Sequence, residues 1–253
     1  MPSKPTIILV HGAFCGGWAF DAFRAPLEAA GYAVIAPELR GHGAGEPSSA
    51  VVNVSMSDYA KDIAALIKAQ PTPPVVIGHS LGGLVAAMAA AKAEVAGLIL
   101  LAPSPPWGIA GGTMEEAGSA MALYALGPFW AQAIEPDGFV AGLYSLDKMS
   151  AEDARRVSKQ MRAESGRAMW ETLNWWLDPF MTTSVGAVRA PVLAMAGERD
   201  LIHPPATVRQ TTAKLGGMMQ VMPGMSHWLI GEPGWERVAA ACLEWMAGLV
   251  EAA

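Results

Sequence analysis

Three side chains in this 253-residue sequence, Ser80, Asp200 and His227, are of the types that together activate a hydroxyl group as a nucleophile. The imidazole takes the proton of the hydroxyl, while the carboxylate fixes the tautomer of the imidazole and stabilises its charged form. Each of the three follows a separate apolar run that is typical of a buried strand. Because the carboxyl ends of parallel strands lie along one edge of a sheet, we expect the three side chains to meet there.

The serine stands in the stretch Gly78-His79-Ser80-Leu81-Gly82, between an apolar run and an alanine-rich run that favours a helix. Glycines two residues before and after the serine suit a tight strand-to-helix turn, where a Cβ atom would collide with the backbone. The helix would place free N–H groups and the positive end of its dipole beside the serine oxygen. These five residues alone also fit an ordinary turn, but the chain order serine, aspartate, histidine favours a nucleophile elbow.

The carboxylate of the set has two candidates in one loop, Asp200 and Glu198. The strand after the serine ends in Leu101-Ala102-Pro103, which contains no carboxylate. We therefore assign the acid to Asp200 and keep Glu198 as the alternative.

We expect His42 to fix its glycine-rich loop by hydrogen bonds, and His203 to be a surface loop residue.

A glycine-rich loop, His11-Gly12-Ala13-Phe14-Cys15-Gly16-Gly17-Trp18, follows the first predicted strand. It lacks the glycine and lysine patterns of phosphate-binding loops, so we do not expect a nucleotide site. Backbone N–H groups of this loop, together with the N–H of the residue after Ser80, could instead bind an oxyanion.

Composition excludes several classes of partner. The net charge is −6, and lysines and arginines form no cluster, which argues against binding to nucleic acid or to an anionic membrane. Cys15 and Cys242 are too few for a disulfide framework, and no metal-ligand spacing is present, so we expect free thiols, no metal and no cofactor. A short start before the first strand and the lack of an unbroken apolar run favour a cytoplasmic protein. The oligomeric state is not indicated.

Strand-like runs at 6–10, 33–36, 75–78 and 97–102 alternate with helical segments over the first hundred residues. Ser55 and Asp58, three residues apart, indicate a capping box at the start of one of these helices. Between 103 and 188 the strand signals vanish, and helix-length segments with large apolar residues replace them. The parallel pattern resumes after 189. We therefore predict an α/β fold with a doubly wound, mostly parallel sheet. Residues 1–102 and 189–253 would form the core, and 103–188 an inserted helical cap.

These motifs make the chain similar to the α/β-hydrolase superfamily over nearly its whole length. The resemblance rests on the loop after the first strand, the elbow and three further stretches: Arg40-Gly41-His42-Gly43, Gly197-Glu198-Arg199-Asp200 and His227. It implies that the N–H groups of Ala13 and Leu81 form an oxyanion hole. The His-Gly-Ala-x-x-Gly-Gly-Trp pattern also resembles the opening of plant methyl-ester esterases and hydroxynitrile lyases.

The cap is rich in aromatic side chains, and we expect some of them to line a substrate pocket beneath it. The candidates in the cap are Trp130, Trp170, Trp175 and Trp176. Two further candidates, Phe14 and Trp228, lie in the core. Trp175 and Trp176 are adjacent on a predicted helix, about 100° apart, so at most one of them should face the ligand.

The expected function is that of a cofactor-independent serine hydrolase. It would cleave a carboxylic ester of a small or medium-sized apolar substrate through an acyl-enzyme, and a lactone or thioester would suit the same groups. One alternative is a hydroxynitrile lyase or carbon–carbon hydrolase that uses the same three side chains. Another is a ligand-binding protein without catalytic activity on a hydrolase scaffold.

Overall fold

A single parallel sheet of six strands forms the centre of the computed structural model, which describes residues 4–251 except 115–116, 119–120, 122–123 and 125–126. The strand order is β2-β1-β3-β4-β7-β8, and every pairing is parallel. The predicted doubly wound sheet is confirmed. Its strands are β1 (Ile7–Val10), β2 (Val34–Ile35), β3 (Val75–His79), β4 (Gly97–Leu101), β7 (Val192–Gly197) and β8 (Met218–Met222).

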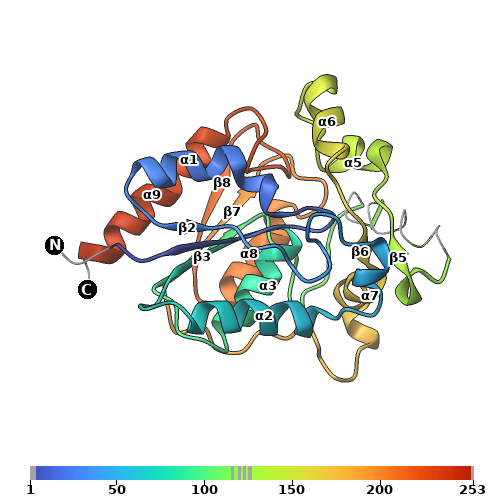
Figure 1. Ribbon diagram of the computed structural model, residues 1–253, viewed down its shortest axis with the longest axis horizontal. Helices are drawn as coiled ribbons and strands as arrows, with labels where there is room; N and C mark the ends of the chain where they lie inside the picture. The colour runs from blue at the N-terminus through green and yellow to red at the C-terminus, as the bar shows by residue number, and fades with distance from the viewer. Residues whose placement is uncertain (1–3, 115–116, 119–120, 122–123, 125–126, 252–253) are drawn as a thin grey trace.

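Helices cover both faces of the sheet (Figure 1). Helices α1 (Asp21–Ala29) and α9 (Trp235–Glu251) pack together on one face. Helices α2 (Met56–Lys68), α3 (Leu81–Ala90) and α8 (Pro205–Lys214) lie on the other. Two short 3₁₀ helices, η1 (Gly17–Phe20) and η2 (Ser48–Val51), lie in the loops after β1 and β2.

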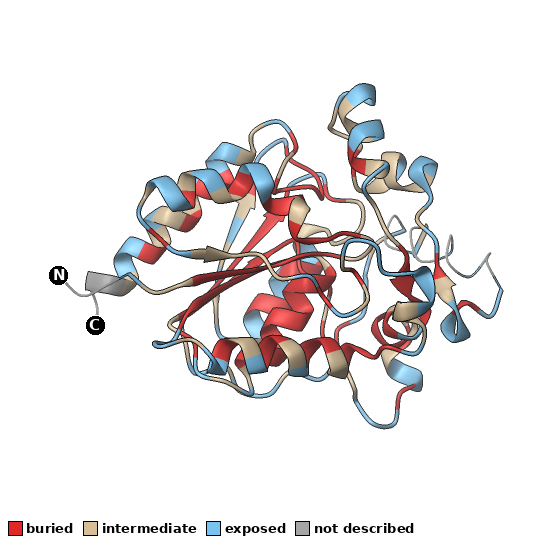
Figure 2. Ribbon diagram, viewed as in Figure 1, coloured by how far each residue is buried: buried red, intermediate tan, exposed pale blue. Residues whose placement is uncertain are grey.

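The apolar runs form strands because both of their faces are covered. In β1, Ile8 and Val10 belong to the hydrophobic core under α2 and α3, whereas Ile7 and Leu9 belong to the core under α1 and α9. All five residues of β3 and every residue of α3 are buried (Figure 2). The elbow between β3 and α3 is therefore held between two buried elements, which fixes its position.

Helix α2 begins at a capping box, as the sequence predicts. The hydroxyl of Ser55 accepts the N–H of Asp58, and the Asp58 carboxylate accepts the N–H of Ser55. This reciprocal pair satisfies two N–H groups at the start of the helix. The result is a well-defined loop before α2, against which part of the segment 103–188 packs.

The segment between β4 and β7 lies beyond the carboxyl ends of the strands (Figure 1). The prediction that it contains no strands was wrong, because two short strands in it pair antiparallel. Strands of two residues are too short to show a period in the sequence. We keep 103–188 as a proposed cap on a core of 1–102 and 189–253. Its described elements are η3 (Phe129–Ala131), β5 (Ala133–Ile134), α5 (Gly138–Tyr144), α6 (Ala151–Ser158), β6 (Glu164–Ser165), α7 (Gly166–Leu173) and η4 (Trp175–Leu177).

A helix that crosses a bilayer needs about 20 predominantly apolar residues. Of the helices in the described part of the chain, none combines the necessary length with the necessary apolar character.

Candidate active site

Ser80 occupies a strained turn between β3 and α3. Its φ and ψ are +53° and −124°, a backbone conformation that is rare for a residue with a side chain. The two flanking glycines make the turn possible. A Cβ on Gly78 would lie 2.3 Å from the Gly82 carbonyl oxygen, and a Cβ on Gly82 would lie 2.2 Å from the His11 carbonyl oxygen. The structure therefore has the geometry of a nucleophile elbow at this serine.

The three side chains selected from the sequence form one hydrogen-bonded chain. His227 Nδ1 lies 2.9 Å from Asp200 Oδ2, and His227 Nε2 lies 2.9 Å from Ser80 Oγ. A carboxylate only accepts, so Nδ1 carries the proton and Nε2 of the neutral ring accepts the serine hydroxyl. Asp200 and His227 are both buried. This arrangement can remove the proton of Ser80 and place the resulting positive charge beside a carboxylate.

The carboxylate of Asp200 is held in its ionised form. Burial alone would raise the pKa of Asp200, but the neighbouring His227 and the surrounding hydrogen bonds hold it below its usual range. Its second oxygen, Oδ1, accepts the N–H groups of Ile202 and His203 at 2.8 and 2.9 Å. Glu198 is exposed, and its Oε2 accepts the Gly224 N–H at 2.9 Å instead. Of the two candidate acids, only Asp200 contacts the imidazole.

Two backbone N–H groups near Ser80 are available to a ligand. A Cβ on Gly12 would lie 3.1 Å from the Ser80 Cβ, so the loop after β1 packs directly against the serine. Neither the Ala13 N–H nor the Leu81 N–H has a hydrogen-bond acceptor in the part of the chain that the structure describes. The next N–H of the loop, that of Phe14, is taken by Glu164. The proposed oxyanion donors therefore stay Ala13 and Leu81.

Two further histidines lie against His227. The ring centroids of His79 and His203 are 5.1 and 5.4 Å from that of His227. Burial, followed by the charge of His227, lowers the pKa of each to about 3, so both rings are neutral. His203 lies in the loop after β7, as predicted, but it is half-buried rather than fully exposed. Its Nε2 lies 3.0 Å from Ser104 Oγ, a contact across 99 positions of the chain that no local pattern indicates.

These two neutral histidines should make the protein sensitive to acid. The folded-state pKa values of His79 and His203, about 3, lie below the ordinary value of 6.5. The unfolded chain therefore binds more protons below pH 6.5, and the stability present above that pH is lost as the pH falls toward 3. Each histidine should contribute up to about 1.4 kcal/mol per pH unit.

Urea unfolding between pH 7 and pH 4.5 would measure this slope in the wild type and in His203→Asn. We expect a shallower slope in the variant, because one of the titrating imidazoles is gone. Parallel curves for the two proteins would contradict the assignment of a neutral His203. The slope is compared rather than the stability itself, because the substitution also changes packing.

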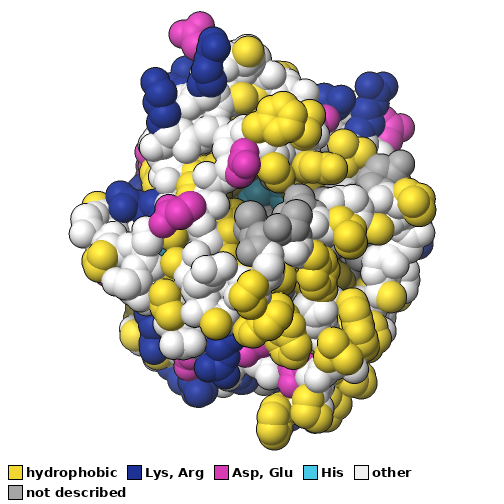
Figure 3. All heavy atoms as spheres, turned by 90° about the vertical axis from the view of Figure 1, so that its right-hand side faces the viewer, with side chains coloured by type: hydrophobic (Ala, Val, Ile, Leu, Met, Phe, Trp, Pro, Cys, Tyr) yellow, Lys and Arg dark blue, Asp and Glu magenta, His cyan; other side chains and the backbone are white. Residues whose placement is uncertain are grey.

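Exposed aromatic side chains lie in the segment beyond the strand ends. Trp130 is 48% exposed and Trp176 is 60% exposed, and Phe139 and Phe180 are exposed further still. Figure 3 looks onto this end of the molecule and shows hydrophobic side chains around a hollow in which histidine surface is visible. Lysine and arginine side chains lie nearer the edges of the same view. Acidic side chains also lie beside the hollow.

Trp175 and Trp176 do not lie on an α-helix as expected. They begin the 3₁₀ helix η4, in which successive side chains are about 120° apart. Trp175 is half-buried and packs edge-on against Trp107, with ring centroids 5.4 Å apart. That at most one of the pair faces a ligand stays a prediction, and Trp176 is the more exposed of the two.

The remaining aromatic candidates are less exposed. Phe14 and Trp170 are half-buried. Trp228 is 4% exposed and packs against Trp18 and His79, with ring centroids 6.5 and 5.5 Å apart. Trp228 therefore belongs to the core, and we do not include it in the proposed binding surface.

The family of the chain follows from comparison with known proteins. Residues 7–241 match the model of the alpha/beta hydrolase family. The match covers both halves of the sheet and the segment between them. The chain belongs to this family, as its fold and its elbow indicate.

Individual relatives are similar to different extents. The pyrethroid hydrolase of Sphingobium wenxiniae is 40% identical over 97 residues, which are 38% of this chain and 34% of that protein. The pimeloyl-[acyl-carrier protein] methyl ester esterase of Stenotrophomonas maltophilia is 27% identical over 269 residues, covering 97% of this chain and 94% of that one. In the first three curated matches the chain spans about a third of each relative's length.

A solved structure shows the same fold over the full length. The crystal structure of a pyrethroid hydrolase from Sphingobium faniae has a TM-score of 0.72 and 24% sequence identity, covering 98% of this chain and 99% of that one. At this identity the likeness concerns the fold alone. The chemistry has to be argued from the site.

Proposed function

We propose that this protein is a serine hydrolase that cleaves a carboxylic ester through an acyl-enzyme. The observation that carries the proposal is the continuous chain from Ser80 Oγ to His227 and Asp200, with both contacts at 2.9 Å. Support comes also from the two free N–H groups beside the serine. Relatives whose names describe ester hydrolysis, such as the methyl ester esterase, agree with it.

The reaction follows from the roles of these groups. Ser80 Oγ attacks the ester carbonyl while His227 Nε2 takes the hydroxyl proton, and the N–H groups of Ala13 and Leu81 bind the oxyanion that forms. His227 then gives its proton to the departing alkoxide, which leaves as the alcohol. Water, deprotonated by the same nitrogen, attacks the acyl-enzyme. The bond to Ser80 Oγ then breaks, His227 returns the proton to that oxygen, and the acid is released. Asp200 stays ionised and stabilises the imidazolium in both steps.

The substrate that fits best is apolar and uncharged, of small to medium size. The exposed Trp130 and Trp176 offer apolar contact area, and the lysine and arginine side chains of the described residues lie away from the hollow in Figure 3. A lactone or thioester would react at the same groups, because each presents a carbonyl and a leaving group that one proton transfer can assist.

A panel of p-nitrophenyl esters with acyl chains of rising length tests this function. We expect kcat/KM to rise roughly fourfold per methylene group until the site is full, because each buried methylene contributes about 0.8 kcal/mol. With non-activated esters the products should be one acid and one alcohol. Release of an aldehyde or ketone from a cyanohydrin, without ester turnover, would favour the lyase alternative instead.

Trp130→Ala and Trp176→Ala should reduce selectivity more than chemistry. We expect each variant to flatten the chain-length profile while kcat for the shortest ester stays within about threefold, because these side chains contact substrate rather than the reacting carbonyl. Trp175→Ala, next in sequence to Trp176 but packed on Trp107, is the matched control. Identical profiles in all four proteins would place substrate selection outside these tryptophans.

A further inference from the structure

A buried carboxylate of the segment 103–188 has no part in the proposed reaction but lies against the loop after β1. Glu164 in β6 has no exposed surface. Its Oε1 accepts the Tyr59 hydroxyl and the Ser165 N–H, both at 2.7 Å. Its Oε2 accepts the Phe14 N–H at 3.3 Å and forms an ion pair with His42 Nε2, also at 3.3 Å. This carboxylate therefore joins three elements of the core to the segment above them.

Glu164 is ionised in spite of its burial. Burial alone would raise its pKa, but His42, the Tyr59 hydroxyl and the Ser165 N–H lower it below the usual range. The pKa of His42 shifts in the opposite direction. Burial would lower it, but the neighbouring Glu164 raises it above its usual value. A neutral side chain at position 164 would leave some of these donors without an acceptor, which is costly in a buried site.

Phe14 is the part of the loop that Glu164 holds. The residues Gly12–Cys15 form a turn, closed by the Cys15 N–H and the Gly12 carbonyl at 3.3 Å, and Phe14 has a φ of +63°. A residue with a side chain keeps this left-handed conformation only where its surroundings stabilise it. Two contacts do so here. The Phe14 N–H donates to Glu164, and the Phe14 carbonyl accepts the Arg162 N–H at 2.9 Å.

We propose that Glu164 is a positioning residue for the oxyanion hole, because its bond to the Phe14 N–H holds the turn in which the Ala13 N–H faces the substrate oxygen. The proposal rests on ester hydrolysis at Ser80. Without this bond the turn can relax away from its positive φ, and the Ala13 N–H, one residue earlier, would move with it. The segment 103–188 would then contribute to stabilising the transition state as well as to choosing the substrate.

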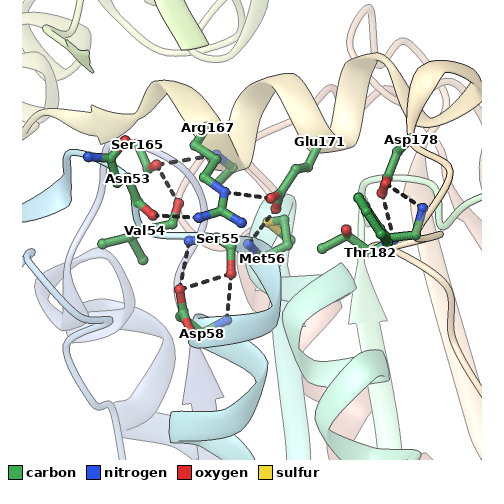
Figure 4. Close-up of polar contacts among 12 residues, drawn as sticks. Asn53, Val54, Ser55, Met56, Asp58, Ser165, Arg167, Glu171, Asp178 and Thr182 are labelled. Carbon is green, nitrogen blue, oxygen red and sulfur yellow. Dashed lines mark hydrogen bonds and ion pairs between the residues drawn. The ribbon is translucent and has the colours of Figure 1, made fainter. Parts of the chain in front are cut away.

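Glu171 provides a matched control. It is a buried carboxylate in α7 of the same segment, where its Oε2 accepts the Met56 N–H and its Oε1 accepts Arg167 Nε, both at 2.9 Å (Figure 4). Met56 begins α2, so Glu171 joins the segment to the core at a different place from the loop after β1. A substitution here removes a buried contact of the same chemical kind without affecting Phe14.

The experiment compares Glu164→Gln and Glu171→Gln with the wild type on an activated ester. We expect kcat of Glu164→Gln to fall about 10- to 100-fold with KM changed less than threefold, because losing a whole oxyanion donor costs about 10²–10³. Glu171→Gln should keep kcat within about threefold. The affinity for a trifluoromethyl ketone, which forms an oxyanion adduct with the serine, should fall in Glu164→Gln by the same factor as kcat.

Equal kcat values for the two variants, with circular dichroism spectra like that of the wild type, would overturn the proposal. So would a loss of kcat in Glu164→Gln without a loss of ketone affinity. If Glu164→Gln does not fold, the Tyr59→Phe variant is measured instead. This variant removes one hydrogen bond to Glu164 and leaves the Glu164 carboxylate charged. For Tyr59→Phe we expect a kcat about threefold to tenfold lower than that of the wild type, with an affinity for the trifluoromethyl ketone that falls by the same factor. An unchanged kcat would overturn the proposal.

The experiment distinguishes failure of the proposed function from failure of the role proposed for Glu164. A wild-type protein without ester turnover contradicts ester hydrolysis before any variant is compared. If the wild type hydrolyses the ester and the two variants have the same kcat, only the proposed role of Glu164 is contradicted.

Discussion

Replacement of Ser80 by alanine should lower kcat for ester hydrolysis by about a millionfold. In the proposed reaction the serine oxygen forms the bond to the acyl group, and His227 and Asp200 act only through it, so the three groups would lose their function together. Only binding and the oxyanion donors remain, and these give far smaller rate enhancements. The KM should change little, because the substituted atom is small and contributes little to ground-state binding.

Ser104→Ala is the control for this experiment. Ser104 is a buried neighbour whose N–H donates to the Ser80 carbonyl and whose hydroxyl contacts His203 rather than His227. We expect its kcat to stay within about tenfold of the wild type. Residual hydrolysis by Ser80→Ala within tenfold of the wild type would show that another group is the nucleophile.

Asp200→Asn should cost about 10⁴ in kcat. An asparagine in this place can donate to His227 Nδ1, which favours the tautomer whose Nε2 carries the proton and cannot accept from Ser80. The loss should occur in kcat, since this carboxylate is buried and contacts His227. Steady-state kinetics on an activated ester measures it.

Glu198→Gln separates the two candidate acids. Glu198 is exposed, and its carboxylate contacts the Gly224 N–H, so its substitution should change kcat by less than about threefold. If Glu198→Gln were instead the damaging change and Asp200→Asn nearly neutral, the acid would have been assigned to the wrong residue.

Much of the fold could be predicted because it depends on local patterns. Each strand of the central sheet was recognised from an apolar run, and β1, β3 and β4 begin and end within one residue of the prediction. The elbow was recognised for a steric reason that the structure confirms, since a Cβ on Gly78 or on Gly82 would collide with backbone. The start of α2 was recognised from the spacing of Ser55 and Asp58.

The parts that were missed depend on contacts between distant segments. Glu164 lies 150 positions from Phe14 and 105 from Tyr59, and nothing in the residues around it indicates that its carboxylate is buried. The same is true of the contacts that His203 makes with Ser104 and His227. A buried charge becomes recognisable only when the donors around it are known.

The aromatic candidates show a related limit. Composition indicates that a segment holds many tryptophans, but it does not say which of them pack inward. Trp228 follows His227 directly and is nevertheless buried against Trp18. Trp176 lies next to Trp175, yet the two differ in exposure because a 3₁₀ turn directs one side chain outward.

The measurement that tests the nucleophile most directly is covalent labelling with a fluorophosphonate, followed by intact-mass analysis and peptide mapping. We expect one adduct per chain, located on Ser80, with a labelling rate that falls together with ester turnover in Asp200→Asn. The Ser80→Ala protein should remain unlabelled, and Ser104→Ala should be labelled like the wild type. An adduct on another residue, or a protein that hydrolyses esters without being labelled at Ser80, would contradict the proposed acyl-enzyme mechanism.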